Sequence, residues 1–355
     1  MGIRLRSAVF VGFFVSLSVT GPVFGDVAAA NDRQPLFESH EPLALTIELP
    51  YQRGINRDRL GESEYRSAEV TYVDANAGEV MLPVEIRTRG KTRRRKKTCD
   101  MPPLRLRFDT GAVAGTLFAS QRGLKLVTHC QDREAYHQYE LLEYLAYRLQ
   151  NLFTEHAQRV RLVQVTYQEK GREIAARNGI LLENWRRVAK RTGTTDADVD
   201  GAVRMESLSV PDVNRIAVFN YMIGNEDWTV LWPEPNENCC HNTKPLFTTA
   251  GTVIPLLYDF DYSGLVDAPY ALAKPPNNDV RRRKYRGLCH TQDTLEETLV
   301  IFRDKREAIY DMVRSVEGLR SSKVKGTLNY FDRFYKVIND PEQVERKMIR
   351  ACKVE

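Results

Sequence analysis

The stretch from Phe219 to Leu265 holds the densest set of polar signals in this chain of 355 residues. It reads FNYMIGNEDWTV, continues through an insert, and then reads HNTKPLF, TTAGT and VIPLLYDFDYSGL. The apolar pattern predicts a helix that ends at Gly224, because glycine accepts the left-handed conformation that ends many helices. The later pattern predicts a short hairpin that ends in the sequence Tyr-Asp-Phe-Asp. A helix, an acidic loop and a hairpin therefore follow one another.

Asp227 lies in the loop after this helix. A rigid helix that ends in glycine holds such a loop in place, and functional side chains concentrate on loops of this kind. Metal-dependent phosphoryl transfer needs one carboxylate to orient the attacking group. We therefore expect Asp227 to be the catalytic residue. The alternative is a solvated aspartate in an ordinary helix-ending turn.

Two carboxylates close the hairpin. Alternation along the strand points Asp259 and Asp261 to the same face, where they repel each other unless a cation lies between them. Asn242, just before the hairpin, supplies a neutral oxygen, although Asn236 and Asn238 compete for this role. Oxygen ligands of this kind suit Mg²⁺ or Mn²⁺, so we expect Asn242, Asp259 and Asp261 to be the metal-binding residues. The alternative is a polar strand end.

The first half supplies cations that can contact phosphates. A predicted strand leads through Arg89 and Gly90 into a basic loop, and such a loop can cover a chain of phosphates. We expect the run from Arg93 to Lys97 to be solvated. Lys125 alternates with apolar neighbours and faces either solvent or a cleft. Glu140 and Glu143 on the following helix can pair with it.

The first thirty residues have the form of a secretory signal peptide. A basic start, Met1–Arg6, precedes an apolar run from Ser7 to Thr20, and small residues follow. That run is too short for a membrane anchor. We therefore expect a periplasmic or secreted protein with no stable membrane span after cleavage. The net charge of +5 is too small to indicate nucleic acid as a partner.

The six cysteines form an even set, which in an exported protein suggests disulfides. The neighbours Cys239 and Cys240 cannot easily bond to each other, so we expect each of them to bond a distant partner. A zinc site is the alternative. No Cys-x-x-Cys motif supports it.

Periodicity divides the chain into a strand-rich first half and a helical second half. The predicted strands span residues 43–49, 68–73, 80–86, 104–108, 160–167 and 179–182, with a hairpin near 245–259. The predicted helices span residues 135–153, 210–222, 294–316, 321–338 and 341–352. We therefore predict an α+β protein of two lobes: a signal peptide (1–30), a strand-rich N-lobe (31–185) and a helical C-lobe (186–355).

The order of these motifs resembles a known family. Arg-x-Arg-Gly, a later Lys, Gly-x-x-x-Glu, Asn-x-Asp, Asn and Tyr-Asp-x-Asp follow one another as in the spore-coat H (CotH)-type atypical kinases. HipA-type kinases share a similar final set of motifs. The chain also resembles an exported bacterial branch that carries Gly-Asn-x-Asp-Trp and Tyr-Asp-Phe-Asp. The resemblance covers about residues 80 to 265.

The resemblance implies a two-lobed, protein-kinase-like fold that binds ATP with Mg²⁺ or Mn²⁺ and transfers a phosphoryl group to a protein hydroxyl. It gives Asp227 the catalytic role and places Asn242 and Asp259 at the metal. It makes Lys125 and Glu143 the pair that orients the nucleotide, and it matches Glu183 to the glutamate on the strand between the lobes. The insert before Asn242 and the basic loop after Arg89 depart from the family pattern.

Two other functions compete with this one. A non-catalytic, kinase-like interaction protein of the envelope or cell surface agrees with the insert and with a compartment poor in ATP. Transfer of a nucleotidyl group by the same metal site is the other alternative. The intact Asp, Asn and Asp positions favour an enzyme.

Overall fold

The computed structural model describes residues 2, 33–59, 62–197, 199, 201–233, 238–272 and 279–354. The expected signal peptide, apart from its second residue, lies outside the described residues, and so does Asn236. By their contacts, residues 34–355 form one compact unit.

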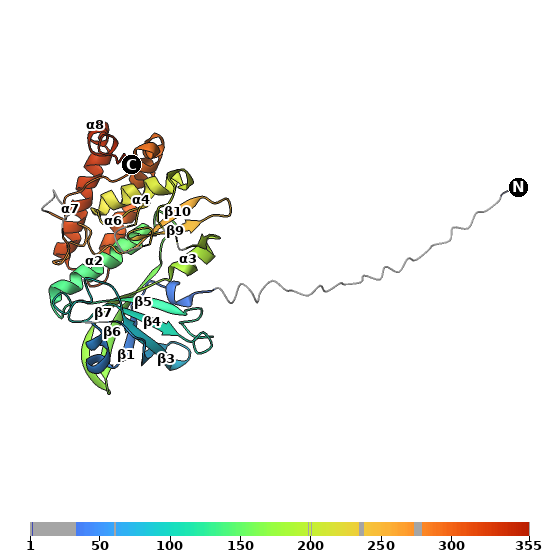
Figure 1. Ribbon diagram of the computed structural model, residues 1–355, viewed down its shortest axis with the longest axis vertical. Helices are drawn as coiled ribbons and strands as arrows, with labels where there is room; N and C mark the ends of the chain where they lie inside the picture. Colours follow the sequence, from blue (N-terminus) through green and yellow to red (C-terminus); the bar gives the residue numbers. More distant parts are fainter. Residues whose placement is uncertain are drawn as a thin grey trace. The chain divides into compact units, whose positions relative to one another are not determined.

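Seven strands close into a barrel (Figure 1). Their order around it is β1-β2-β3-β4-β5-β7-β6, and all neighbours are antiparallel except β1 and β6, whose parallel pairing closes the ring. The strands are β1 (Leu43–Glu48), β2 (Arg66–Asp74), β3 (Gly78–Thr88), β4 (Leu104–Phe108), β5 (Gly123–Thr128), β6 (Val160–Glu169) and β7 (Arg172–Leu182).

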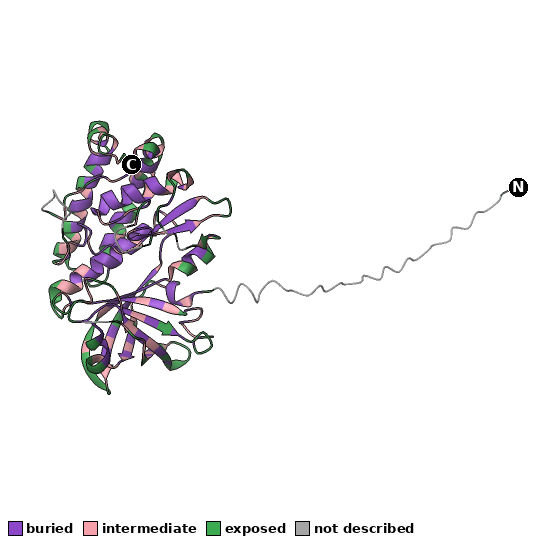
Figure 2. Cartoon of the chain, viewed as in Figure 1, coloured by how far each residue is buried: buried purple, intermediate pink, exposed green. Residues whose placement is uncertain are grey.

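The barrel interior is an apolar core. In β4, Leu104, Leu106 and Phe108 are buried, whereas Arg105 is partly exposed and Arg107 is exposed. This alternation follows from the two-residue repeat of a strand, which sends successive side chains to opposite faces. Figure 2 shows buried and exposed residues mixed along the barrel strands.

The barrel overturns the predicted fold class. The strand-rich half closes into a seven-stranded mixed barrel with a helical part packed beside it, so the two-lobed, protein-kinase-like fold with a helical C-lobe is wrong. The reason lies in the pairing of Leu43–Glu48 with Val163–Gln168. Alternation within each segment predicts a strand, but it does not say which distant strand becomes its partner.

The chain after the barrel is helical, with one small sheet of order β10-β9-β8. The strands are β8 (Thr195–Asp196), β9 (Thr243–Phe247) and β10 (Val253–Leu257). Helix α2 (Glu134–Gln150) connects β5 to β6, and the helices after the barrel are α3 (Trp185–Arg191), α4 (Val210–Ile223), α5 (Leu295–Asp304), α6 (Arg306–Ser315), α7 (Ser321–Ile338) and α8 (Pro341–Val344). Short 3₁₀ or π turns are η1 (Pro35–Phe37), η2 (Tyr51–Ile55), η3 (Arg57–Arg59), η4 (Met205–Ser207), η5 (Cys289–Thr294) and η6 (Glu345–Ile349).

Helix α4 carries the chain towards the candidate site. As predicted, it ends at Gly224, which has a φ of 68°. The side chain of its N-cap, Ser209, accepts no backbone hydrogen bond and instead donates to Asp212 Oδ2 at 2.5 Å. The predicted helix over 294–316 is wrong in its length, because the chain breaks at Lys305 and forms two helices.

All six cysteines are paired. Cys99 bonds Cys130 and Cys289 bonds Cys352, whereas the neighbours Cys239 and Cys240 bond each other. The expectation of distant partners for that last pair is therefore wrong. The other four cysteines already pair across the fold, so neither neighbour has a distant thiol left to bond.

Gly224 gives the first testable prediction. Replacing it with alanine forces a side chain into the left-handed region and places a methyl group against the Tyr330 hydroxyl. We expect Gly224→Ala to lower the free energy of unfolding by about 2–4 kcal/mol in urea denaturation. The control is Gly326→Ala in the exposed middle of α7, where nothing opposes the methyl group. It should raise stability by about 0.5–1 kcal/mol. Equal effects of the two substitutions would contradict this account.

Candidate functional site

A pocket of about 660 Å³ brings separated segments of the chain together. One side comes from the barrel, through β5 and the loop after β3. The other side comes from the loop after α4 and from the two ends of the β9–β10 hairpin. The predicted site residues that line this pocket are Arg89, Lys125, Asp227, Asn242, Asp259 and Asp261.

The backbone of Asp227 is held by a buried amide. Asn225 follows Gly224, and its side-chain Oδ1 accepts the Asp227 N–H at 3.0 Å. Its Nδ2 donates to Asn220 Oδ1 on α4 at 2.9 Å. Because Asn225 is almost fully buried, these hydrogen bonds are shielded from water and tie the loop to the helix.

The Asp227 carboxylate is held on both sides. Asn242 Nδ2 donates to the backbone oxygen of Asp227 at 2.8 Å and to Asp227 Oδ2 at 3.1 Å. On the other side, His241 Nε2 lies 3.2 Å from Asp227 Oδ1. An amide carries an acceptor oxygen beside its NH₂ group. Asn242 can therefore hold Asp227 through nitrogen and offer Oδ1 to a cation.

Two predicted metal-binding residues adopt the left-handed backbone conformation. Asn242 has a φ of 51° and Asp259 a φ of 67°. This conformation costs non-glycine residues on the order of 1–3 kcal/mol and is found disproportionately at functional sites. The Asp259 N–H donates to the Tyr147 hydroxyl at 2.9 Å. The barrel-side helix α2 thus fixes the end of the hairpin.

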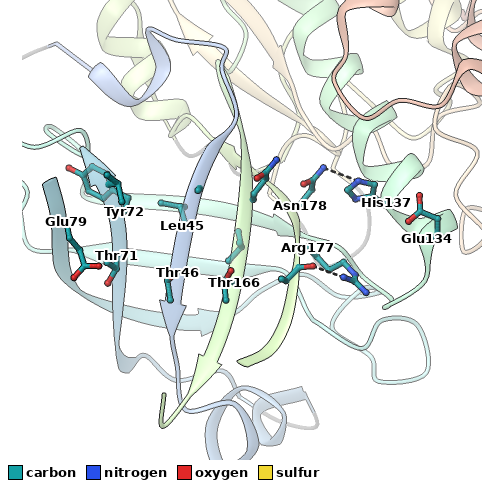
Figure 3. A pocket seen from close by; sticks show the side chains of 15 residues that line it. Leu45, Thr46, Thr71, Tyr72, Glu79, Glu134, His137, Thr166, Arg177 and Asn178 are labelled. Carbon is teal, nitrogen blue, oxygen red and sulfur yellow. Dashed lines mark hydrogen bonds between the residues drawn. The ribbon is translucent and has the colours of Figure 1, made fainter. Parts of the chain in front are cut away.

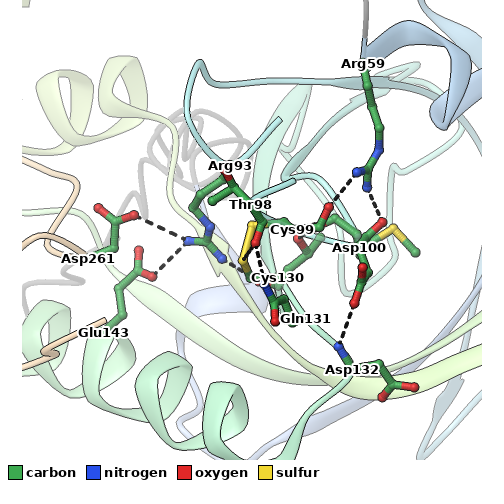
Figure 4. Close-up of a disulfide and its surroundings, with 12 residues drawn as sticks. Arg59, Arg93, Thr98, Cys99, Asp100, Cys130, Gln131, Asp132, Glu143 and Asp261 are labelled. Carbon is green, nitrogen blue, oxygen red and sulfur yellow. Dashed lines mark hydrogen bonds and ion pairs between the residues drawn. A yellow bond between two sulfur atoms is a disulfide. The ribbon is translucent and has the colours of Figure 1, made fainter. Parts of the chain in front are cut away.

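Arg93 reaches into the acidic side of the pocket (Figure 4). Its Nη1 lies 3.2 Å from Glu143 Oε2 and 4.0 Å from Asp261 Oδ2, and its Nη2 donates to the Thr128 carbonyl at 2.6 Å. The expectation of a solvated loop is wrong for this residue, although Arg95 to Lys97 are exposed. The Cys99–Cys130 disulfide ties this loop to the end of β5.

The two carboxyl groups beside Arg93 hold protons more tightly than usual. Burial raises the pKa of Glu143 to about 7, with Asp259 adding to the rise and Arg93 opposing it. Burial, followed by the charges of Asp259 and Glu143, raises the pKa of Asp261 well above its ordinary range. A bound cation would favour the ionised form of each group, so this side of the pocket suits a metal.

Lys125 and Glu143 do not form an ion pair in the structure. Arg93 occupies the Glu143 carboxylate, and Lys125 Nζ lies 4.8 Å from the centre of the Tyr258 ring. Burial lowers the pKa of Lys125 to about 7, and the charge of Arg89 contributes to this shift. Lys125 therefore lines the pocket as a cation that an anionic ligand would help to keep protonated.

Glu183 lies outside the lining of this pocket. Its side chain is fully buried and accepts hydrogen bonds from Arg159 at 3.0 Å, Arg191 at 3.0 Å and Gln34 at 2.9 Å. These contacts join the chain before β1 to the segments around β6 and α3. In this structure the residue acts as a buried electrostatic link between elements.

The donor set for a metal is small. Within the described residues, no three His, Cys, Asp or Glu side chains come close enough to form a metal-binding group. Mg²⁺ commonly binds one or two carboxylates and completes its coordination with water and phosphate oxygens. Asp259 and the Asn242 amide oxygen fit that pattern, with Asp261 nearby and already engaged by Arg93. The residues therefore fit a metal that arrives with its phosphates.

Sequence reasoning missed Arg93 and Tyr147. The sequence did contain one signal for a buried cation, because Glu140 and Glu143 lie three residues apart in a segment (139–147) whose other residues are apolar or aromatic. Both are buried in the structure. Two such acids require a compensating positive charge. No signal in the sequence pointed to the Tyr147 hydroxyl as a hydrogen-bond acceptor.

A second hollow, of about 600 Å³, lies on the outer side of β1, β2, β6 and β7 (Figure 3). Thr46, Thr71 and Thr166 are among its lining residues, and Asn178 Nδ2 lies 3.4 Å from His137 Nε2 at its edge. No predicted site residue lines it.

No family model matches this chain, and no curated protein matches it. In the part of the chain that the structure describes, no helix combines the length and apolar character needed to cross a bilayer.

The Arg93 contacts predict a pH-dependent loss of stability. Arg93→Gln leaves Glu143 and Asp261 without their cation, so we expect a loss of about 3 kcal/mol in urea unfolding. Both groups already have raised pKa values in the folded state. Between the ordinary carboxyl pKa and the raised folded value, the folded state binds more protons than the unfolded state, so the free energy of unfolding falls as pH rises. At pH 8 the two carboxylates of the variant are ionised without a cation beside them, so the variant should lose more stability at pH 8 than at pH 5. Arg95→Gln, on the exposed part of the loop, is the control. Equal losses at both pH values would contradict this assignment.

Lys125 predicts the opposite pH trend. Its folded pKa of about 7 lies below the unfolded value of 10.5, so the unfolded chain binds more protons between these values and stability rises with pH there. We expect Lys125→Met to be more stable than the original chain by about 1–2 kcal/mol at pH 6, with the gap closing towards pH 10. Urea unfolding at both pH values measures this. A gap that does not change with pH would show that Lys125 is not a buried cation.

Proposed function

We propose that this pocket carries metal-assisted transfer of a phosphoryl group from a nucleotide to a protein hydroxyl. One observation carries the proposal: Lys125, Asp227, Asn242 and Asp259 come from separate segments and line the same pocket. The chemistry needs a cation for phosphates, oxygen ligands for a metal and a carboxylate for the acceptor. The pocket contains a candidate for each requirement.

Each residue has a defined part in the proposed reaction. Asp227 accepts the proton of the attacking hydroxyl while that oxygen forms a bond to the terminal phosphorus. The bond from this phosphorus to the bridging oxygen breaks, and the nucleoside diphosphate leaves with the bonding electrons. Asn242 and Asp259 would hold the metal, which when bound would supply positive charge to the phosphates. Lys125 positions the same phosphates.

The order of motifs supports the same chemistry through its resemblance to the CotH-type atypical kinases. The proposal does not rest on the fold, because unrelated folds host the same reaction and function is argued from the site. Three disulfides in the described residues agree with a periplasmic or secreted protein. That location belongs to the proposal, as does a protein acceptor.

A non-catalytic role is the second candidate, and one observation favours it. The Asp227 carboxylate contacts Asn242 and His241 on its two sides, as a structural aspartate would. Nucleotide binding without transfer would support a non-catalytic interaction protein. Mass spectrometry of the protein after incubation with ATP and Mn²⁺ separates phosphoryl from nucleotidyl transfer, because the two adducts differ greatly in mass.

Ligand-induced stabilisation tests the proposed site. A ligand that binds only the folded protein raises its stability, by about 2.7 kcal/mol at a hundred times the Kd. We expect ATP with Mn²⁺ to raise the Tm of the oxidised protein by a few degrees. Asp259→Asn should abolish this rise, because it removes a carboxylate ligand without changing side-chain size.

The matched control is Asp311→Asn on the exposed surface of α6, which should keep the full rise. A rise that survives in Asp259→Asn would remove Asp259 from the metal site. No rise in any of the three proteins would overturn the proposed function.

A further inference from the structure

Three cations lie directly opposite one another on neighbouring barrel strands. Arg87 of β3 is paired with Arg105 of β4, and Arg105 is paired with Lys125 of β5. We call these three residues the cationic row. With strands about 4.8 Å apart, the row spans about 10 Å. The next residues along these strands, Leu106 and its partners Ile86 and Leu124, are buried inside the barrel. Because side chains alternate between the two faces of a sheet, the cationic row lies on the outer face.

Within the described residues, the cationic row forms no ion pair of its own. Two residues further along the same strands, Glu85 and Arg107 are opposite each other and form an ion pair at 2.6 Å. Across the described part of the chain, no residue of the row makes such a pair with a carboxylate. Like charges directly opposite each other destabilise a sheet. The pattern therefore carries an electrostatic cost that an anion would remove.

Arg87 also has a hydrogen-bond donor without a partner. Its guanidinium carbon lies 4.8 Å from the centre of the Tyr65 ring, and its Nε is buried without a hydrogen-bond partner. Buried donors of this kind usually find a partner. A ligand oxygen above the row would supply one.

The row begins inside the candidate pocket. Lys125 lines the pocket together with Arg89 and Lys244, and Arg89 lies two residues beyond Arg87, just past the end of β3. Besides burial, the charges of Arg89, Arg105 and Lys244 lower the pKa of Lys125, and the charge of Asp259 opposes them. A ligand that leaves the pocket along β4 and β3 therefore passes one cation after another.

We propose that the cationic row is a phosphate-chain subsite, which holds a linear series of phosphate groups running outward from the pocket. Arginine guanidinium groups match phosphate oxygens in geometry and retain their charge at all physiological pH values. The row rests on interior strands whose backbone groups already pair with their neighbours, so it offers no free edge to an extended peptide. This inference rests on the proposed function, because it takes the bound chain to be that of the phosphoryl donor.

Two donors share this chemistry: a nucleoside triphosphate and inorganic polyphosphate. Calorimetric titration of the oxidised full chain with ATP, tripolyphosphate and long-chain polyphosphate compares them. EDTA in the buffer removes divalent cations, so that binding does not depend on the metal-binding residues. We expect Arg87→Gln/Arg105→Gln to weaken binding of the phosphate chain at least tenfold, because two charge-assisted hydrogen-bonding groups are lost.

The matched control is Lys96→Gln/Lys97→Gln, which removes the same charge from the exposed loop. It should change affinity less than threefold. A loss only for long-chain polyphosphate identifies the inorganic chain as the ligand, and an equal loss for ATP identifies the nucleotide. Unchanged affinity in the row variant, or an equal loss in the loop variant, would overturn the subsite.

Two further proteins keep the result interpretable. Arg105→Gln alone tests the centre of the row if the double variant does not fold, and it should show a loss in the same direction. Asp311→Asn, on the exposed surface of α6, should bind the chain as the original protein does in EDTA. Suppose that binding of the phosphate chain in EDTA depends on the row, but ATP with Mn²⁺ does not raise the Tm. The subsite would then stand, and the proposed function would be rejected. If ATP with Mn²⁺ raises the Tm but binding of the phosphate chain does not depend on the row, only the subsite would be rejected.

Discussion

The acidic side of the pocket depends on one buried guanidinium. Glu143 and Asp261 approach each other from α2 and from the end of the hairpin, and Arg93 lies between them. Without this cation, burial of two carboxyl groups would oppose packing of the barrel against the helices. The arginine comes from a loop that a disulfide holds to the end of β5. One covalent link and one charge therefore keep the two sides of the pocket together.

The pocket combines two opposite electrostatic surfaces. Asp227, Asp259 and Asp261 come from the segments after the barrel, whereas Lys125 comes from barrel strand β5 and Arg89 from the loop after β3. A ligand that carries both a metal ion and phosphates meets both requirements, since the metal suits the carboxylates and the phosphates suit the cations. This division explains why residues far apart in sequence are needed for one site.

Much of the local structure was predictable from the sequence, because the signals are local. The alternation in β4, the helical period of α2 and the stop at Gly224 each concern a few neighbouring residues. The meeting of Lys125 with Asp227 in one pocket was anticipated only through a resemblance in motif order. Closure of the barrel, the bond between Cys239 and Cys240 and the reach of Arg93 were not predictable. The barrel and the Arg93 contacts depend on which distant segments meet, and the bond between the neighbouring cysteines depends on how the other four pair across the fold. Periodicity carries no such information.

The parallel pairing of β1 with β6 also governs the order in which the fold can be completed. Leu43 is paired with Val163, so the first strand waits for a partner made much later in synthesis. Until then, β1 has one unpaired edge, and open edges of this kind promote association between chains. The cysteines of the Cys99–Cys130 bond are both made within this interval. Their cross-link can thus restrain the central strands while the barrel is still an open sheet.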